Sequence, residues 1–167
     1  METSADLSLE ESMATGLIRK ARIADINAIR KILQLFAAKG ELLARTMAEL
    51  YSLVRDYYVY QEDHNSPVIG VSALHVCWEA LGEVRSVAVL EQYQRRGVGA
   101  RLVETCLSEA ITLGLERVFV LTYRPDFFAR FGFEVVDKNI LPHIVWADCV
   151  RCPKFPECDE IAMLLKF

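Results

Sequence analysis

Val87-Ala88-Val89 and, shortly after it, Gln94-Arg95-Arg96-Gly97-Val98-Gly99 decide how this chain folds. A β-branched run ends, a basic loop with two glycines follows, and an apolar helical pattern begins at Val98. Glycine lets a backbone approach a ligand closely, and a helix N-terminus offers unpaired N–H groups to an anion. The stretch therefore predicts a strand, a loop and a helix that together bind a phosphate-bearing ligand.

The spacing of this loop excludes the two common nucleotide-binding loops. A Walker A loop needs Lys-Ser/Thr after its last glycine, and a Rossmann fingerprint needs a third glycine where Leu102 stands. The alternative to a specialised loop is a glycine-containing turn in an unrelated α/β domain.

Composition narrows the class of protein. The chain has 167 residues, a net charge of −4 and 53% hydrophobic residues. These values are typical of one globular domain, which we place at 15–167 after a flexible leader at 1–14. A negative net charge argues against nucleic acid as a partner. No apolar run approaches the length of a membrane span, which is about 18 residues. Five cysteines without a framework spacing favour reduced thiols and a cytoplasmic location.

Hydrophobic periodicity predicts an α/β domain. Helical spacing follows Asp25 and ends at Gly40, and a second helix starts with a Thr46–Glu49 capping box. Residues 137–158 are expected to be irregular. We expect strands at 17–20, 57–60, 68–78, 82–89, 117–121, 133–136 and 161–165, and helices at 26–39, 47–56, 98–113 and 125–130.

Two motifs resemble those of the GCN5-related N-acetyltransferases, the GNAT superfamily. Gln94–Gly99 fits the pyrophosphate loop Gln/Arg-x-x-Gly-x-Gly/Ala at every fixed position, and Phe127–Phe133 looks like the later Phe-Tyr-x-x-x-Gly-Phe segment. The resemblance implies a mixed, mostly antiparallel sheet of about seven strands with about four helices. It also implies acetyl-CoA as co-substrate and no metal. Backbone contacts to the cofactor would come from Val87, Ala88, Val89, Gln94, Arg95, Arg96, Gly97, Val98 and Gly99.

Glu83 is our candidate for the catalytic base. It resembles in position the catalytic glutamate of the histone-acetylating branch. The two-residue period of a strand predicts that Glu83, Arg85 and Val87 share one face. Alternatively, Glu83 is a surface carboxylate or only the ion-pair partner of Arg85. His75 is a weaker candidate, since a lone histidine on an apolar strand is usually a packed, hydrogen-bonded residue.

The proton donor for the leaving thiolate departs from the family pattern. Many members carry Tyr where this chain has Phe128, and Phe cannot donate a proton. Either Tyr123 replaces it or water protonates the thiolate. The plainer alternative for Tyr123 is a core aromatic whose hydroxyl lies at the rim.

Arg45, Arg85 and Arg124 are candidate substrate-binding residues. Arginine pairs with carboxylates through two parallel hydrogen bonds, so three of them would suit a substrate with two carboxylates. Three unrelated surface arginines are the alternative. The segments 40–46, 121–128 and 146–163 resemble the short, kinase-free bacterial N-acetylglutamate synthases.

That second resemblance implies the reaction. Acetyl would pass from acetyl-CoA to the α-amine of L-glutamate, the first step of arginine biosynthesis, by direct attack in a ternary complex. Other readings are a GNAT enzyme for another amino acid or small amine, and a non-catalytic acetyl-CoA-binding regulatory domain. A homodimer is a further expectation, since dimers are common in the family.

The C-terminal cysteines leave one metal alternative open. His143, Cys149, Cys152 and Cys158 are four potential zinc ligands, but only one pair has the tight Cys-x-x-Cys spacing. Packed or surface thiols are the other interpretation.

Overall fold

The structure, a computed structural model, describes residues 14–167. The leader expected at 1–14 lies outside the described residues except for Ala14. The N–H of Ala14 donates to the carbonyl of Arg96 at 3.0 Å, so this residue is joined to the basic glycine loop at residues 94–99.

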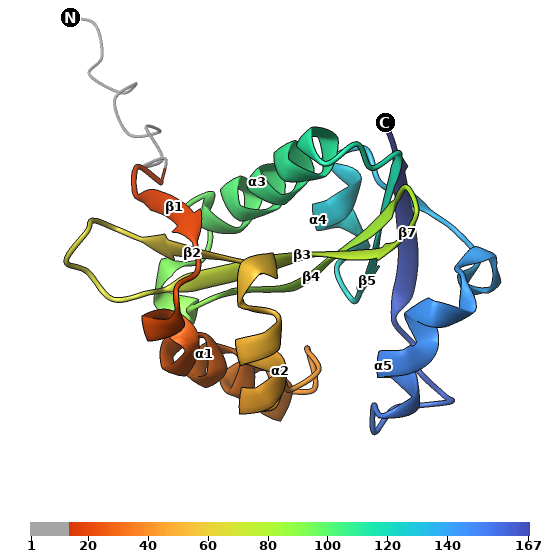
Figure 1. The fold of residues 1–167 in the computed structure, drawn as a ribbon, viewed down its shortest axis with the longest axis horizontal. Helices are drawn as coiled ribbons and strands as arrows, with labels where there is room; N and C mark the ends of the chain where they lie inside the picture. The colour runs from red at the N-terminus through yellow and green to blue at the C-terminus, as the bar shows by residue number, and fades with distance from the viewer. Residues whose placement is uncertain (1–13) are drawn as a thin grey trace, which may run out of the picture.

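A seven-stranded sheet runs through the described residues in the order β1-β2-β3-β4-β5-β7-β6 (Figure 1). Its neighbouring strands are antiparallel, except that β4 and β5 are parallel. This is the mixed α/β architecture that the sequence predicted. The strands are β1 (Leu17–Lys20), β2 (Tyr57–Gln61), β3 (Gly70–Trp78), β4 (Leu81–Val89), β5 (Arg117–Thr122), β6 (Glu134–Val135) and β7 (Ile161–Lys166).

Helices cover both faces of the sheet (Figure 1). On one face, α3 (Val98–Thr112) and α4 (Pro125–Ala129) bury an apolar core with β3, β4, β5 and β7. On the other face, α1 (Ile26–Ala38) packs on β2, β3 and β4, with α2 (Met47–Ser52) beside it. The segment 137–158, which contains α5 (Trp146–Val150), packs on β5 and β7. Among residues 14–167 no helix is both long and apolar enough to cross a membrane.

Local signals account for most helix ends. The capping box is present, with Thr46 and Glu49 bonded reciprocally, and Gly40 takes a left-handed φ of +72° just after α1. The prediction for residues 137–158 was wrong in one respect. This stretch, called the α5 segment below, contains α5 and two 3₁₀ turns, so the described residues contain five α-helices.

The two central strands part where the site is expected. β4 pairs with β5 only from Leu81↔Arg117 to Glu83↔Phe119, and beyond Glu83 the strands diverge. A bulge interrupts β4 at Ser86, whose φ is +55° and where the pairing with β3 shifts register. One extra residue moves the following side chains to the opposite face. The prediction that Val87 shares a face with Glu83 and Arg85 was therefore wrong: Val87 packs with the α3–α4 core.

Candidate active site

A cleft of about 620 Å³ opens between the parted ends of β4 and β5. Of the nine predicted cofactor contacts, eight line it: Val87, Ala88, Val89, Gln94, Arg95, Gly97, Val98 and Gly99. The ninth, Arg96, does not. Its guanidinium lies 5.7 Å from the centroid of the Tyr93 ring, and its side chain is exposed.

The basic loop forms an anion site at the start of α3. Gly97 occupies the N-cap position with φ +80°, and among the described residues no side-chain hydrogen bond caps this end of the helix. The first N–H groups of this 15-residue helix are therefore open to a ligand, and the helix dipole favours negative charge there. Arg95, also at positive φ (+63°), adds a cation to the same wall. These features fit the phosphates of CoA.

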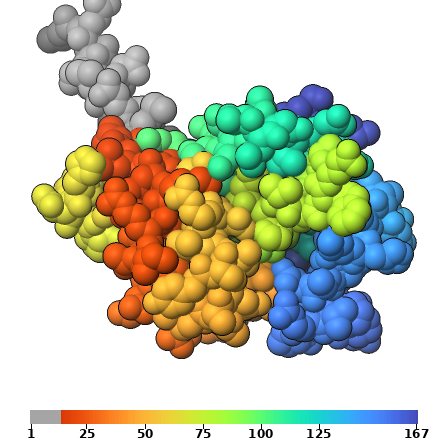
Figure 2. Space-filling view, in the orientation of Figure 1, coloured from red at the N-terminus to blue at the C-terminus, as the bar shows by residue number. Residues whose placement is uncertain are grey.

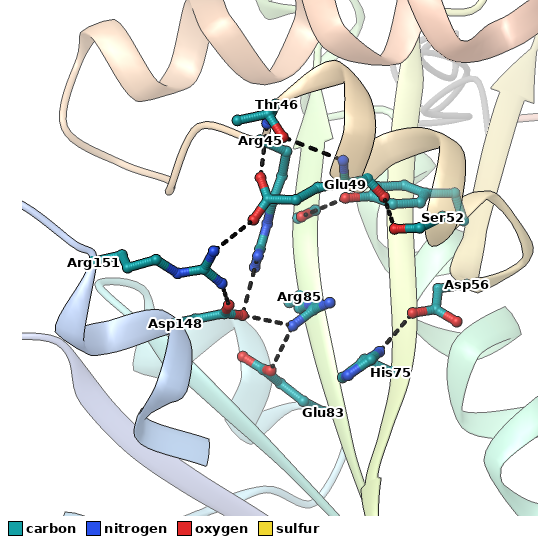
Figure 3. Close-up of polar contacts among 12 residues, drawn as sticks. Arg45, Thr46, Glu49, Ser52, Asp56, His75, Glu83, Arg85, Asp148 and Arg151 are labelled. Atoms are coloured by element: carbon teal, nitrogen blue, oxygen red, sulfur yellow. Dashed lines mark hydrogen bonds and ion pairs between the residues drawn. The ribbon is translucent and has the colours of Figure 1, made fainter. Parts of the chain in front are cut away.

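Glu83 lies where β4 and β5 separate. Its side chain is 16% exposed and its carboxylate Oε2 lies 3.5 Å from Nη1 of Arg85. Burial raises the pKa of Glu83, and the nearby Arg85 and Arg45 only partly offset that rise. It is thus no surface carboxylate, and it does contact Arg85. His75 is held differently, with Nδ1 2.6 Å from the Asp56 carboxylate (Figure 3).

Arg45 and Arg85 converge on a carboxylate of the chain itself (Figure 3). Nη1 of Arg45, from the loop before α2, donates to Oδ2 of Asp148 at 3.0 Å. Nη1 of Arg85 donates to the same oxygen at 2.9 Å. The side chains of both arginines are less than 10% exposed. Two of the three predicted arginines therefore come together around one carboxylate.

Arg124 is placed differently from the other two arginines. It is exposed, occupies the N-cap of α4 and lines the cleft at the end of β5. Its backbone N–H donates to Oγ1 of Thr122 at 2.8 Å, which fixes the turn that carries it. Arg124 can thus reach a ligand in the cleft, but it does not share the carboxylate of Asp148.

Tyr123 lies on the wall of the cleft, 37% exposed. Its hydroxyl donates to Oδ1 of Asp159 at 2.8 Å and accepts from the ammonium of Lys154. Burial and the Asp159 hydrogen bond raise the pKa of Tyr123 more than Lys154 lowers it, so the phenol is protonated at neutral pH. Phe128 also borders the cleft but is buried edge-on against Phe127 and Phe133.

The metal alternative finds no support in the structure. Across residues 14–167 no three His, Cys, Asp or Glu side chains gather in a group that could hold a metal ion. Cys149, Cys152 and Cys158 are free and half-buried, and His143 is exposed.

Sequence reasoning missed three residues of this region. Asp148 and Lys154 come from the α5 segment. Their partners, Arg45 and Gly40, lie more than 100 positions earlier in the chain, so no local pattern predicts these contacts. Their one signal was the resemblance of 146–163 to the synthases. Ser86 gave none, since a positive φ is unusual for serine.

Comparison with known proteins agrees with this geometry. The sequence model of the acetyltransferase (GNAT) family matches residues 27–133. A Chlorobaculum tepidum protein named an uncharacterized N-acetyltransferase is 39% identical over 151 residues, which cover 90% of this chain and 96% of the relative. An amino-acid acetyltransferase of Mycobacterium tuberculosis is 39% identical over 136 residues, covering 81% of this chain and 78% of the relative.

Among solved structures, the N-acetylglutamate synthase of Neisseria gonorrhoeae complexed with coenzyme A and N-acetyl-glutamate superposes with a TM-score of 0.81 at 26% identity. The match covers 92% of this chain but 35% of that one, so this chain corresponds to about a third of that synthase. The glycine loop, the parted strands and the family match lead to one conclusion: this chain belongs to the GNAT family of acetyltransferases, which use acetyl-CoA.

Proposed function

We propose that this GNAT acetyltransferase moves the acetyl group of acetyl-CoA to the α-amine of L-glutamate. The observation that carries the proposal is the convergence of Arg45 and Arg85 on a single carboxylate oxygen at 3.0 and 2.9 Å. Two guanidinium groups that already meet around one carboxylate suit an acidic amino acid. The name of the M. tuberculosis relative supports an amino acid as acceptor, and the name of the N. gonorrhoeae synthase supports glutamate.

The residues present fit acetyl-CoA. The open N-terminus of α3 and Arg95 suit its phosphates, and β4 beyond Glu83 has an edge that no longer pairs with β5. Free backbone groups on that edge can bond the pantetheine arm and a carbonyl oxygen. When bound, acetyl-CoA supplies a thioester carbonyl carbon and a thiolate leaving group.

Glu83 is the proposed base. An amino acid carries an ammonium group at neutral pH, and it must lose a proton before its nitrogen can attack. Burial raises the pKa of Glu83, which makes its carboxylate a better proton acceptor than an ordinary glutamate. The nitrogen then forms a bond to the carbonyl carbon, the carbon–sulfur bond breaks, and the nitrogen gives up a second proton.

Tyr123 is the proposed acid, because its phenol is protonated and lies on the wall of the cleft. One proton passes to the departing thiolate and the other is released, so the reaction yields CoA thiol, the N-acetyl amino acid and one proton. Phe128 cannot take part, since it has no exchangeable proton.

The biological setting follows from the acceptor. Acetylation of glutamate would place this chain at the first step of arginine biosynthesis. All five cysteines are free, which suits a reducing compartment, and we therefore propose the cytoplasm.

Thiol release from acetyl-CoA, measured with a panel of amino acids and small amines, tests the proposal. We expect selective turnover with L-glutamate. Turnover with a different acceptor would keep the acetyltransferase and reject glutamate. Binding of acetyl-CoA without turnover of any acceptor would instead support a regulatory domain.

A further inference from the structure

The α5 segment makes polar contacts with the loop before α2 and with α2 itself. These contacts surround Arg45 and Arg85, called the arginine pair below. Asp148 contacts Arg45 and Arg85, and Arg151 lies 3.6 Å from the carboxylate of Glu49 on α2. Lys154 donates to the carbonyl of Gly40. Figure 2 shows the α2 region, in orange, and the α5 segment, in blue, facing each other on one side of the molecule.

Neither arginine uses its full hydrogen-bonding capacity in this arrangement. Asp148 takes one Nη1 donor from each, while Nε of Arg45 and Nε of Arg85 are buried and have no hydrogen-bond partner among residues 14–167. A buried N–H donor without a partner costs free energy, especially on a charged group. An unpaired Nε therefore indicates a position where a ligand atom could accept a hydrogen bond. A carboxylate that binds side-on to Nε and an Nη atom would satisfy it.

We propose that Asp148 is a specificity-determining residue that occupies the acceptor's carboxylate position and must be displaced by the carboxylate of the incoming acceptor. This inference rests on the proposed function, because it assumes an acidic acceptor. An acceptor with a carboxylate gains Arg45 and Arg85 in exchange for Asp148. An amine without a carboxylate has no group that can replace Asp148, so Arg45 and Arg85 stay bound to Asp148.

The charges around Asp148 support an exchange of one anion for another. Burial alone would raise the pKa of Asp148, but Arg45, Arg85 and Arg151 together lower it, so Asp148 is ionised at neutral pH. Glu83 lies beside Arg85 and Glu49 lies beside Arg151, so these carboxylates would repel an additional anion next to Asp148. Replacement keeps the local charge constant.

Kinetics of Asp148→Asn test the exchange. While Asp148 is bonded to Arg45 and Arg85, the protein cannot bind the acceptor's carboxylate there. Removing the charge in Asp148→Asn should therefore lower the KM for L-glutamate by roughly three- to tenfold. The KM for acetyl-CoA should not change. Glu157→Gln is the control, since Glu157 is an exposed carboxylate of the same segment. An unchanged or higher KM for glutamate in Asp148→Asn, with the melting temperature preserved, would overturn the inference.

Fluorescence gives a readout that needs no turnover. Trp146 begins α5, and the only other tryptophan is Trp78, so Trp78→Phe isolates the signal of the α5 segment. Glutarate, a dicarboxylate without an amine, should change Trp146 emission in this variant, and the change should be lost when Asp148→Asn is added.

The two measurements separate the two ideas. A glutarate response that depends on Asp148, without glutamate turnover, would support the exchange and reject the proposed acceptor. Glutamate turnover with no change of emission and no change of KM in Asp148→Asn would support glutamate as the acceptor and reject the exchange.

Discussion

Arg45 and Arg85, forty positions apart in the chain, donate to the same oxygen of Asp148, at 3.0 and 2.9 Å (Figure 3). Arg45 comes from the loop before α2, Arg85 from the central strand β4, and Asp148 from α5. The contact therefore joins the N-terminal and C-terminal parts of the fold at the acceptor position that we propose.

Arg124 should serve the acceptor and not the cofactor. Because it is exposed on the cleft wall with room for a carboxylate, Arg124→Ala should raise the KM for glutamate by about tenfold to a hundredfold. Steady-state kinetics with each substrate varied checks this. Arg117→Ala, at the opposite end of β5, is the matched control and should change neither constant. A rise in the KM for acetyl-CoA alone would assign Arg124 to the cofactor.

The sequence predicted the fold well because its signals are local. Hydrophobic periodicity and the Thr46–Glu49 capping box act within a few residues, and the element order they predicted is confirmed except for α5. The α5 helix was missed because its stability comes from contacts across the fold, such as Asp148 with Arg45. The face of Val87 was missed because the bulge at Ser86 needs a left-handed serine, which no local pattern indicates.

Only the part of the site that is built from neighbouring residues was fully predictable from the sequence. The cofactor side is built from two nearby stretches of the chain, and the sequence could therefore name eight of its residues: five of the loop Gln94–Gly99 and three of β4. The acceptor side is assembled from separate elements. Sequence reasoning could name Arg45 and Arg85 but could not show that Asp148 already holds them.

Glu83 should control the acid side of the pH profile. Glu83→Gln should lower kcat by about a hundredfold at neutral pH, since it removes the proton acceptor, and by much less at high pH, where the amine is already free. Burial raises the pKa of Glu83, so activity of the parent should fall on acidification at a pH above the usual range for glutamate. The pH profiles of kcat and of kcat/KM, recorded for parent and variant, measure both effects. A variant with the same profile as the parent would remove Glu83 as the base.

Tyr123 should contribute to kcat. Tyr123→Phe removes the only proposed proton donor and should lower kcat by about tenfold or more, because water remains as a weaker source. Phe128→Tyr in the same chain should recover part of the loss, since Phe128 also borders the cleft. Single-turnover thiol release is the measurement. An unchanged kcat in Tyr123→Phe would favour protonation by water.

Asp25 should stabilise the fold in a pH-dependent way. Its carboxylate accepts from both Nη atoms of Arg19 at 2.6 and 3.0 Å, and that hydrogen bonding is the main cause of its lowered pKa. A pKa lowered in the folded state gives stability that is present above the unfolded value and is lost as the pH falls through the folded one. Asp25→Asn should therefore cost about 2 kcal/mol at pH 7 and progressively less below pH 4.

Urea unfolding of Asp25→Asn at several pH values measures this difference. Glu62→Gln, which removes an exposed carboxylate from the turn after β2, is the control and should have little effect. A cost that stays constant down to pH 2 would mean that the ion pair is not its source.

Gly97 and Gly114 allow backbone strain to be separated from cofactor binding. Both glycines have a left-handed φ, +80° and +78°, and a Cβ on either would meet no atom of residues 14–167 within 4 Å. They lie just outside opposite ends of α3. Alanine at either position should cost a similar amount of stability, about 1 kcal/mol, because an L-residue is disfavoured at this φ. Only at Gly97 does a Cβ project beside the open N–H groups that are proposed to bind phosphate.

We therefore expect Gly97→Ala to weaken acetyl-CoA binding by about tenfold and Gly114→Ala to leave it unchanged, although both variants lose the same stability. Calorimetric titration with acetyl-CoA, together with urea unfolding of each variant, measures the two quantities independently. Equal losses of affinity would mean that strain in α3, and not access to its N-terminus, governs binding. Unequal losses at equal stability would locate the phosphates at the start of α3.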